Sequence, residues 1–429
     1  MASKDSNDIP QPLQPVMAAG QAPSATPARP KAKPKAKAGS ARKRPASGGR
    51  RPAPRQSAWR RFLNGVLWVL TLLVAAGLFA ASYSGLLNPA KYSWAAIPVM
   101  TLPLWMVLIL FMAFLDLLLC RKALIAALAA MACCWPAMWD YCPLNISTPS
   151  VPASARTFTM LTYNVTNFTD VTGTYPEGLN PTISYILRVD ADVVNLQELQ
   201  FISAEKSKYI SRDQVDSLYT RYPYILKSGY SQMLLSKYPA KIIDTGEPVH
   251  PANEIAVFRL DIEGEQVTFF NVHLQHFSLT HDDKELYTDI TKLKKDDAAN
   301  IQEVKTQLQE VKTQLLGKIA RAASGRARDI DRLEGFIRRF AGPNAIVAGD
   351  FNDVPGCWGL HQLADMEFRQ VYPKVGFGPM ITFNSDRFYF RIDHVLYRGG
   401  LKPLSMRRGT LKSSDHYPLL VRFQLTAPL

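Results

Sequence analysis

Carboxylate, amide and imidazole side chains recur beside short apolar runs in this sequence. Asn164 ends the apolar run 160–164, and Glu198 directly follows the run 193–197. The remaining members of the set are His273, Asp350, Asn352, Asp393, Asp415 and His416. Because an α/β sheet gathers the ends of its strands at one crevice, these side chains are predicted to converge.

This set of side chains suits the hydrolysis of a phosphate ester. A phosphodiester is anionic, and it repels a nucleophile until a cation and proton donors neutralise its charge. Carboxylate and amide oxygens are ligands that Mg²⁺ and Mn²⁺ prefer, and imidazoles can donate or accept protons. Each residue alone has an ordinary explanation as a helix cap, a core histidine or a surface carboxylate. Their joint occurrence is what indicates a site.

The motifs around these residues resemble those of the endonuclease/exonuclease/phosphatase superfamily, from about residue 158 to 423. They are Thr-Tyr-Asn-Val at 162–165, Leu-Gln-Glu at 196–198, Leu-Leu-Ser-Lys-Tyr-Pro at 234–239, Asn-Val-His-Leu at 271–274, Gly-Asp-Phe-Asn at 349–352, Arg-Ile-Asp-His-Val at 391–395 and Ser-Asp-His-Tyr-Pro-Leu at 414–419. All occur in the family's order. The superfamily includes deoxyribonucleases, abasic-site endonucleases, neutral sphingomyelinases and inositol-polyphosphate phosphatases.

The resemblance implies a Mg²⁺ or Mn²⁺ site and an activated water. Glu198 would be the principal metal ligand, with Asn164 close by and Asp415 able to add a second carboxylate. Asp350 would orient or deprotonate the attacking water. Asn352 would hold that water or a phosphate oxygen.

Two histidines complete the site that the resemblance implies. Asp393 would hydrogen-bond His416 and fix its tautomer, so that the other ring nitrogen faces the phosphate. His273 would be the second imidazole, stabilising phosphate charge or protonating the leaving oxygen. The core motif set shows no departure from the family pattern. A silent phosphate- or lipid-binding module on a membrane stalk is the alternative to an enzyme.

An α/β domain, residues 150–429, must position these groups, because short apolar runs there alternate with turn residues and helical stretches. The resemblance implies a four-layer α/β sandwich, with two packed mixed sheets flanked by helices. Strands are predicted at 157–165, 193–196, 232–236, 255–262, 266–274, 345–348, 391–397 and 417–424. A polar helical stretch at 282–340, broken near Gly325, is predicted to pack on the sheet, or else to form a partner-binding or membrane-contacting arm.

Three apolar segments precede this domain and predict about three transmembrane helices within residues 62–142. The segments are 62–83, 95–119 and 123–139, each near the roughly 20 residues that span a bilayer. The third segment is short and interrupted by Pro136.

Basic residues predict the orientation of these helices, because Lys and Arg prefer the cytoplasmic side. Arg60 and Arg61 flank the first segment, and Arg121 and Lys122 lie between the second and third. Three crossings would place the α/β domain outside the cytoplasm and the N-terminal tail inside it. If the third segment does not cross, the domain stays inside.

The basic excess of the chain lies in residues 1–61, which carry +12 of the formal net charge of +14. This tail is rich in Ala, Pro, Ser and Gly and is predicted to be disordered. It could contact anionic lipid or nucleic acid through charge, or act only as a solubilising and topology-fixing extension. The five cysteines show no CxxC spacing, and so neither a disulfide framework nor a zinc site is indicated.

These features predict a membrane-anchored, divalent-metal-dependent phosphoesterase that acts by metal-assisted attack of water. Its substrate would be a nucleic acid, a phospholipid headgroup or a phosphomonoester. The nearly neutral charge of residues 62–429 gives no bulk electrostatic support for a groove that binds a polyanion. Nucleic acid and lipid remain equal alternatives on the sequence alone.

Overall fold

The computed structural model describes residues 57–147, 150–171, 173–246, 254–277, 301–385 and 388–426. The chain divides into two units, Met1–Arg55 and Gln56–Leu429, and every described residue belongs to the second. The predicted disordered tail therefore lies almost wholly outside the described residues.

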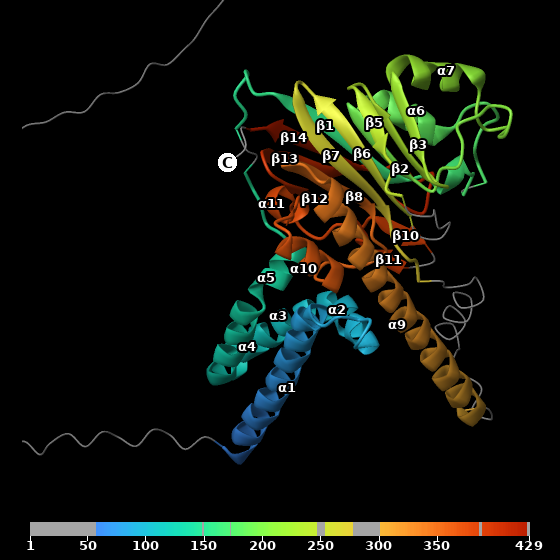
Figure 1. Ribbon diagram of the computed structural model, residues 1–429. Helices are drawn as coiled ribbons and strands as arrows, with labels where there is room; N and C mark the ends of the chain where they lie inside the picture. The colour runs from blue at the N-terminus through green and yellow to red at the C-terminus, as the bar shows by residue number, and fades with distance from the viewer. Residues whose placement is uncertain are drawn as a thin grey trace, which may run out of the picture. The chain divides into compact units, whose positions relative to one another are not determined.

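Two six-stranded mixed sheets form the centre of the α/β region (Figure 1). The first sheet contains, in spatial order, β13 (Leu401–Arg408), β14 (Leu419–Leu425), β1 (Thr157–Asn164), β2 (Val193–Gln197), β4 (Gln232–Ser236) and β3 (Tyr224–Ser228). The second contains β5 (Ala240–Ile243), β6 (Glu254–Ile262), β7 (Glu265–His273), β8 (Asn344–Asp350), β12 (Asp393–Arg398) and β9 (Arg369–Gln370). A separate hairpin joins β10 (Phe383–Ser385) to β11 (Phe388–Phe390).

The inner faces of the two sheets share one apolar core. Phe158 and Phe423 of the first sheet are buried with Phe258 and Phe269 of the second in a single cluster. The rings of Phe158 and Phe423 stack with their centroids 5.5 Å apart. Each fully buried side chain of this size stabilises the fold by about 1.5–3 kcal/mol relative to an exposed one.

Helices cover the outer faces of both sheets and complete the predicted four layers. The first sheet packs on α6 (Pro181–Val189) and α7 (Arg212–Arg221) through a second apolar cluster. The second sheet packs on α9 (Ile301–Phe340) and α10 (Trp358–Asp365), where Leu333 and Phe336 of α9 are buried. The short helix α11 (Tyr372–Val375) follows β9. The predicted fold class is confirmed.

All eight predicted strands occur, with ends that differ from the prediction by at most two residues. The strands that the sequence did not reveal are β3, β5, β9, β13 and the hairpin β10–β11. β3 and β5 are half exposed and carry lysines, and β13 contains Pro403. None of these three strands therefore shows a clear apolar pattern.

The predicted break near Gly325 was wrong, because α9 runs through it to Phe340. A Cβ at Gly325 would lie 2.8 Å from Cγ of Gln275, and so the glycine permits close packing instead of ending the helix. The confirmed part of the predicted helix packs on the sheet. Its first part, 282–300, lies outside the described residues.

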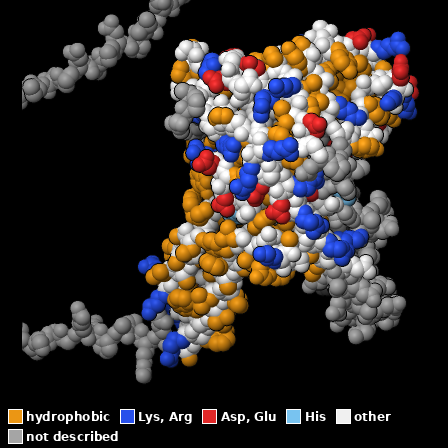
Figure 2. All heavy atoms as spheres, viewed as in Figure 1, with side chains coloured by type: hydrophobic (Ala, Val, Ile, Leu, Met, Phe, Trp, Pro, Cys, Tyr) orange, Lys and Arg blue, Asp and Glu red, His pale blue; other side chains and the backbone are white. Residues whose placement is uncertain are grey.

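The apolar N-terminal segments form a group of packed helices. Helix α1 (Ala58–Tyr83) and helix α3 (Leu102–Leu119) are each long and apolar enough to cross a membrane. Helix α4 (Arg121–Cys133) and helix α5 (Trp135–Tyr141) meet at a bend of 65° and can count as one broken span. Figure 2 shows that hydrophobic side chains dominate the visible surface of this region.

Two of the predicted helices are interrupted. The predicted segment 95–119 divides at Thr101 into α2 (Ala96–Met100) and α3, because Pro103 in the first turn of α3 favours a new helix start there. The segment 123–139 likewise breaks at Cys134, with Pro136 in the first turn of α5. The 3-10 turns η1 (Ser84–Leu86) and η2 (Ser93–Ala95) connect α1 to α2.

Replacement of Gly349 by alanine is expected to destabilise the α/β region by about 2–3 kcal/mol. Gly349 has a φ of +140°, and an added Cβ would lie 2.1 Å from the carbonyl oxygen of Val272 in the neighbouring strand. The control is Gly335→Ala in α9, where an added Cβ meets nothing within 4 Å. Thermal unfolding of the purified chain measures both, and equal stability of the two variants would contradict the strand packing described here.

Candidate active site

The parallel pairing of β1 with β2 places Asn164 beside Glu198. Asn164 is level with Gln197 in the register, and Glu198 is the next residue along the chain. The Nδ2 of Asn164 donates hydrogen bonds to Oε1 of Glu198 at 2.9 Å and to Oδ2 of Asp350 at 3.2 Å. The first sheet is thereby joined to the second at the site.

The second sheet brings His273, Asp350 and Asp393 to one level. His273 of β7 is paired in register with Asp350 of β8, and Asp350 is paired with Asp393 of β12. The Nε2 of His273 lies 3.5 Å from Oε1 of Glu198 and 3.8 Å from Oδ2 of Asp350. One imidazole therefore faces carboxylates from both sheets.

His416 is held between two buried carboxylates. Its Nδ1 lies 2.9 Å from Oδ2 of Asp393, and its Nε2 lies 3.4 Å from Oδ2 of Asp350. The ring of Phe383 packs against the imidazole at a centroid distance of 5.0 Å. The predicted hydrogen bond between Asp393 and His416 is present.

The charges of Asp393 and Asp350 change the protonation of His416, which lies between them. Burial alone would lower the pKa of His416, but the charges of Asp393 and Asp350 outweigh it and raise that pKa to about 10. Burial raises the pKa of Asp350, although His416 opposes the shift. The two carboxylates therefore favour the protonated form of His416, and burial makes Asp350 accept a proton more readily than an exposed aspartate does.

Asn352 and Asp415 lie at the margins of this group. The backbone N–H of Asn352 donates to Oδ1 of Asp350 at 2.8 Å, while its Nδ2 donates to the carbonyl of Leu274. Oδ1 of Asp415 accepts from the hydroxyl of Thr166 at 3.1 Å.

Backbone strain gathers at the same place. Glu198 and Asn352 have φ values of 54° and 50°, and Thr166 has a φ of 46°. Non-glycine residues rarely adopt this left-handed conformation, which costs roughly 1–3 kcal/mol each and is common at functional sites.

Several supporting residues were missed by reasoning from the sequence. The hydroxyl of Thr382 accepts the backbone N–H groups of Ile392 and Asp393, and the hydroxyl of Ser414 accepts that of His416. Beneath the site, Asn271 of β7 accepts from Asn195 and Gln197 of β2 at 3.0 and 2.7 Å. These three buried amides lie within apolar runs, which is the signal that could have revealed them.

The donor atoms fit a hard divalent cation. Asp350, Asp393 and His416 each offer one ligand atom, and these atoms lie within 4.8 Å of one another. Within this trio, however, Nδ1 of His416 is hydrogen-bonded to Asp393 and its Nε2 faces Asp350, so the three groups already interact with one another. Glu198, whose side chain is 36% exposed, is more open to a cation from solvent than the buried Asp350 and Asp393 are.

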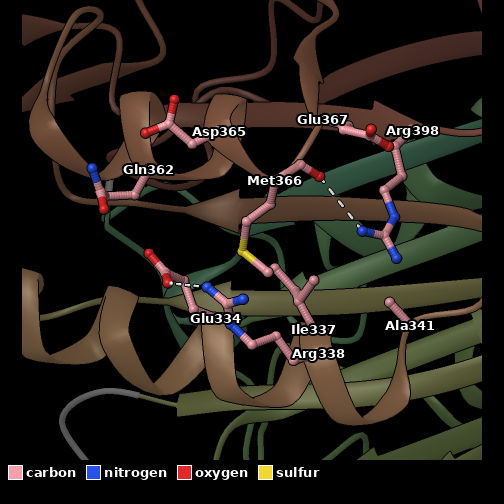
Figure 3. Close-up of a pocket in the computed structure, with 9 residues that line it drawn as sticks. All are labelled: Glu334, Ile337, Arg338, Ala341, Gln362, Asp365, Met366, Glu367 and Arg398. Carbon is pink, nitrogen blue, oxygen red and sulfur yellow. Dashed lines mark hydrogen bonds and ion pairs between the residues drawn. The ribbon is translucent and has the colours of Figure 1, made fainter.

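A separate hollow of about 660 Å³ lies between α9 and α10 (Figure 3). Glu334 and Arg338 form an ion pair of 3.3 Å on one side of it, and Arg398 lies on another. None of the predicted site residues lines this hollow.

Substitution of the neighbouring His394 is expected to change the pH dependence of stability. Burial lowers the pKa of His394 from 6.5 to about 3, and its Nε2 lies 2.9 Å from the carbonyl oxygen of Asp353. Below pH 6.5 the unfolded chain binds a proton that the folded chain refuses, so stability is lost as pH falls. Between pH 6.5 and 5 this loss is about 2 kcal/mol.

The variant His394→Gln removes the titrating ring and keeps an amide donor. The free energy of unfolding should therefore fall less steeply with decreasing pH in His394→Gln than in the wild type. Equal slopes for the two proteins would contradict a neutral, buried His394.

A family comparison assigns this α/β region to a family of phosphoesterases. The family model described as Endonuclease/Exonuclease/phosphatase family matches residues 161–416, and the chain belongs to this family. Residues 64–141 match a second family model, described as Domain of unknown function (DUF8431). A search of curated proteins gave no match.

Solved structures that resemble the chain share little sequence with it. Humanized D. rerio TDP2 is 15% identical over 63% of this chain and 99% of that chain, with a TM-score of 0.39. The endonuclease/exonuclease/phosphatase from Bacteroides vulgatus gives the same identity and coverages, with a TM-score of 0.40. ANGEL2, a 2′,3′-cyclic phosphatase, in complex with adenosine-2′,3′-vanadate, is 15% identical over 66% of this chain and 99% of that chain, with a TM-score of 0.36.

Proposed function

We propose that this protein is a membrane-anchored phosphoesterase that uses Mg²⁺ or Mn²⁺ to hydrolyse a phosphodiester or phosphomonoester. The observation that carries the proposal is the meeting of Glu198, Asp350 and His416. They are far apart in the sequence, yet Asn164 bonds both Glu198 and Asp350, and His416 lies 3.4 Å from Asp350.

Glu198 would hold the cation, with Asn164 orienting its carboxylate and Asp415 adding a more distant one. When bound, the cation would supply positive charge against the phosphate oxygens. Asp350 is placed to take the proton of the attacking water, because burial makes it a stronger base. The backbone N–H of Asn352 holds Oδ1 of Asp350, and Oδ2 faces Asn164 and His416. Asn352 would position that water or a phosphate oxygen.

The two imidazoles would act on the phosphate itself. Asp393 fixes His416 through Nδ1, so its Nε2 can donate to a phosphate oxygen that approaches Asp350. His273 lies beside Glu198 and would stabilise phosphate charge or protonate the leaving oxygen.

The helices before residue 142 support an anchor in the membrane. Two helices are long and apolar enough to span it, or three if the bent pair α4–α5 is one span. Arg60 and Arg61 lie in the first turn of α1, and Arg121 and Lys122 begin α4. With three crossings, both basic pairs share one side with the tail, and the α/β region lies on the other. The positive-inside tendency makes that other side extracytoplasmic.

The proposal is tested with the full chain, purified in detergent and assayed on bis-p-nitrophenyl phosphate and p-nitrophenyl phosphate. Turnover should require Mg²⁺ or Mn²⁺ and should be lost in Glu198→Ala. Absence of turnover with every divalent ion, or full activity of Glu198→Ala, would overturn the proposal. Tight binding of a phosphate compound without turnover would instead indicate a silent binding module.

A further inference from the structure

The catalytic site lies beside α2, which directly precedes a helix that is long and apolar enough to cross a membrane. We infer that it opens onto the bilayer that holds the chain, and that its substrate is the phosphoester headgroup of a lipid in the same leaflet. This inference rests on the proposed function, because it names the substrate of that same site.

The length of α3 places its first residues at the membrane boundary. Its 18 residues span about 27 Å, slightly less than the roughly 30 Å apolar thickness of a bilayer. A crossing by α3 must therefore use its whole length, and Leu102 lies at one edge of the apolar layer. Val99 and Met100, at the end of α2, lie at most three residues from this edge.

Val99 packs directly on residues that adjoin the catalytic side chains. It is 2% exposed and forms an apolar cluster with Val354, which follows Asn352 by two positions, and with Ile392, which precedes Asp393. Backbone contact tightens this junction, because a Cβ on Gly85 would lie 1.8 Å from the carbonyl oxygen of Gly356. Among the described residues, the loops that follow β8 and precede β12 thus contact the end of α2 directly.

The end of α5, the last of the apolar helices, also packs on the α/β region. The indole Nε1 of Trp139 donates to the carbonyl of Pro373 at 3.0 Å, and the Nδ2 of Asn145 donates to the carbonyl of Gly376 at 2.8 Å. Leu144 also forms an isolated β-bridge with Phe377. The α/β region therefore contacts the apolar helices in two places, at the end of α2 and at residues 139–145.

Residues 376–385 and 388–390 connect this attachment to the catalytic histidine. Phe383 and Phe390 of the β10–β11 hairpin pack on the Val99 cluster, and the ring of Phe383 also contacts the imidazole of His416. Within the same segment, Phe377 is 65% exposed and Tyr389 is 53% exposed. Exposed aromatic side chains beside a membrane edge suit the interfacial region of a bilayer.

A lipid headgroup fits this placement better than a nucleic acid does. A phosphoester that is fixed at the bilayer surface needs no long approach to reach a crevice at the same level. A polyanion would have to enter beside the lipid surface without help from net charge, because residues 62–429 are nearly neutral.

The first test uses the full chain in vesicles of phosphatidylcholine and phosphatidylglycerol, with Mg²⁺ supplied. Release of the headgroup is followed for lipids of the enzyme's own vesicles and for labelled lipids of separate vesicles at equal total concentration. Confinement to one surface should make cleavage in the same vesicle about tenfold faster or more. Single-stranded DNA, double-stranded DNA and RNA are assayed beside the lipids.

The outcomes separate the inference from the proposed function. Preferred cleavage of lipids in the same vesicle supports both. Turnover of bis-p-nitrophenyl phosphate or nucleic acid without lipid cleavage would overturn the inference and leave the phosphoesterase intact. Turnover of no phosphate ester at all would overturn the proposed function.

A second test does not depend on turnover. A fluorophore is attached at Tyr389→Cys, in a chain whose Cys133 and Cys142 are serine, and its quenching by lipids that carry a nitroxide near the headgroup is measured. The matched control is Tyr219→Cys on α7, where the native side chain is 56% exposed. Strong quenching at 389 and weak quenching at 219 are expected, and equal quenching would overturn the placement of the crevice at the bilayer.

Discussion

Replacement of Asp350 by asparagine is expected to lower kcat/KM by about 10³- to 10⁴-fold. Asp350 is 1% exposed and contacts Asn164, His416 and the backbone of Asn352. Asparagine occupies the same space, but it cannot accept the proton of water. It also removes one of the two carboxylates that face His416. The loss of activity therefore has two causes: the base is missing, and the protonated form of His416 is less stabilised.

The control for this variant is Asp365→Asn, which changes a carboxylate in the hollow between α9 and α10. That variant should keep activity within about twofold of the wild type, because it lies outside the site. Circular dichroism of both proteins verifies folding. An Asp350→Asn protein that is folded and within tenfold of normal activity would contradict the assignment of Asp350 as the base.

Removal of the proposed metal ligand Glu198 is expected to give the second large effect. Chelation of divalent ions should abolish turnover in the wild type, and added Mg²⁺ should restore it. In Glu198→Gln the Mg²⁺ concentration for half-maximal activity should rise by about 100-fold or more, because a neutral amide replaces a charged oxygen ligand. The carboxylate lies beside Asn164 and His273, and its side chain is 36% exposed.

Glu334→Gln provides the matched control, since Glu334 pairs with Arg338 on the surface of α9. Its Mg²⁺ dependence should equal that of the wild type. A Glu198→Gln protein with an unchanged Mg²⁺ dependence would show that the cation, if one is needed, is held elsewhere.

The residues that carry the chemistry could be predicted because strand position fixes them. Asn164 and His273 end β1 and β7, and Glu198 and Asn352 follow β2 and β8 within two residues. A strand is recognisable from a short apolar run, and its end defines which polar side chains reach the crevice. The structure brings these side chains together as expected.

The remaining parts of the site depend on contacts between distant segments, which a local pattern does not contain. Thr382 supports Asp393 through a loop, and Thr166 supports Asp415 across the ends of β1 and β14. The junction of Val99 with Val354 and Ile392 joins segments more than 250 residues apart. Gly325 was misinterpreted for the same reason, because its role is set by Gln275.

The most direct test of the central claim is a crystal structure of the full chain with Mn²⁺, analysed by anomalous scattering. We expect an anomalous peak within about 2.0–2.3 Å of a carboxylate oxygen of Glu198, in the crevice shared with Asp350 and His416. A bound Mn²⁺ remote from Glu198, or no bound ion under conditions in which the same preparation hydrolyses a phosphoester, would contradict it.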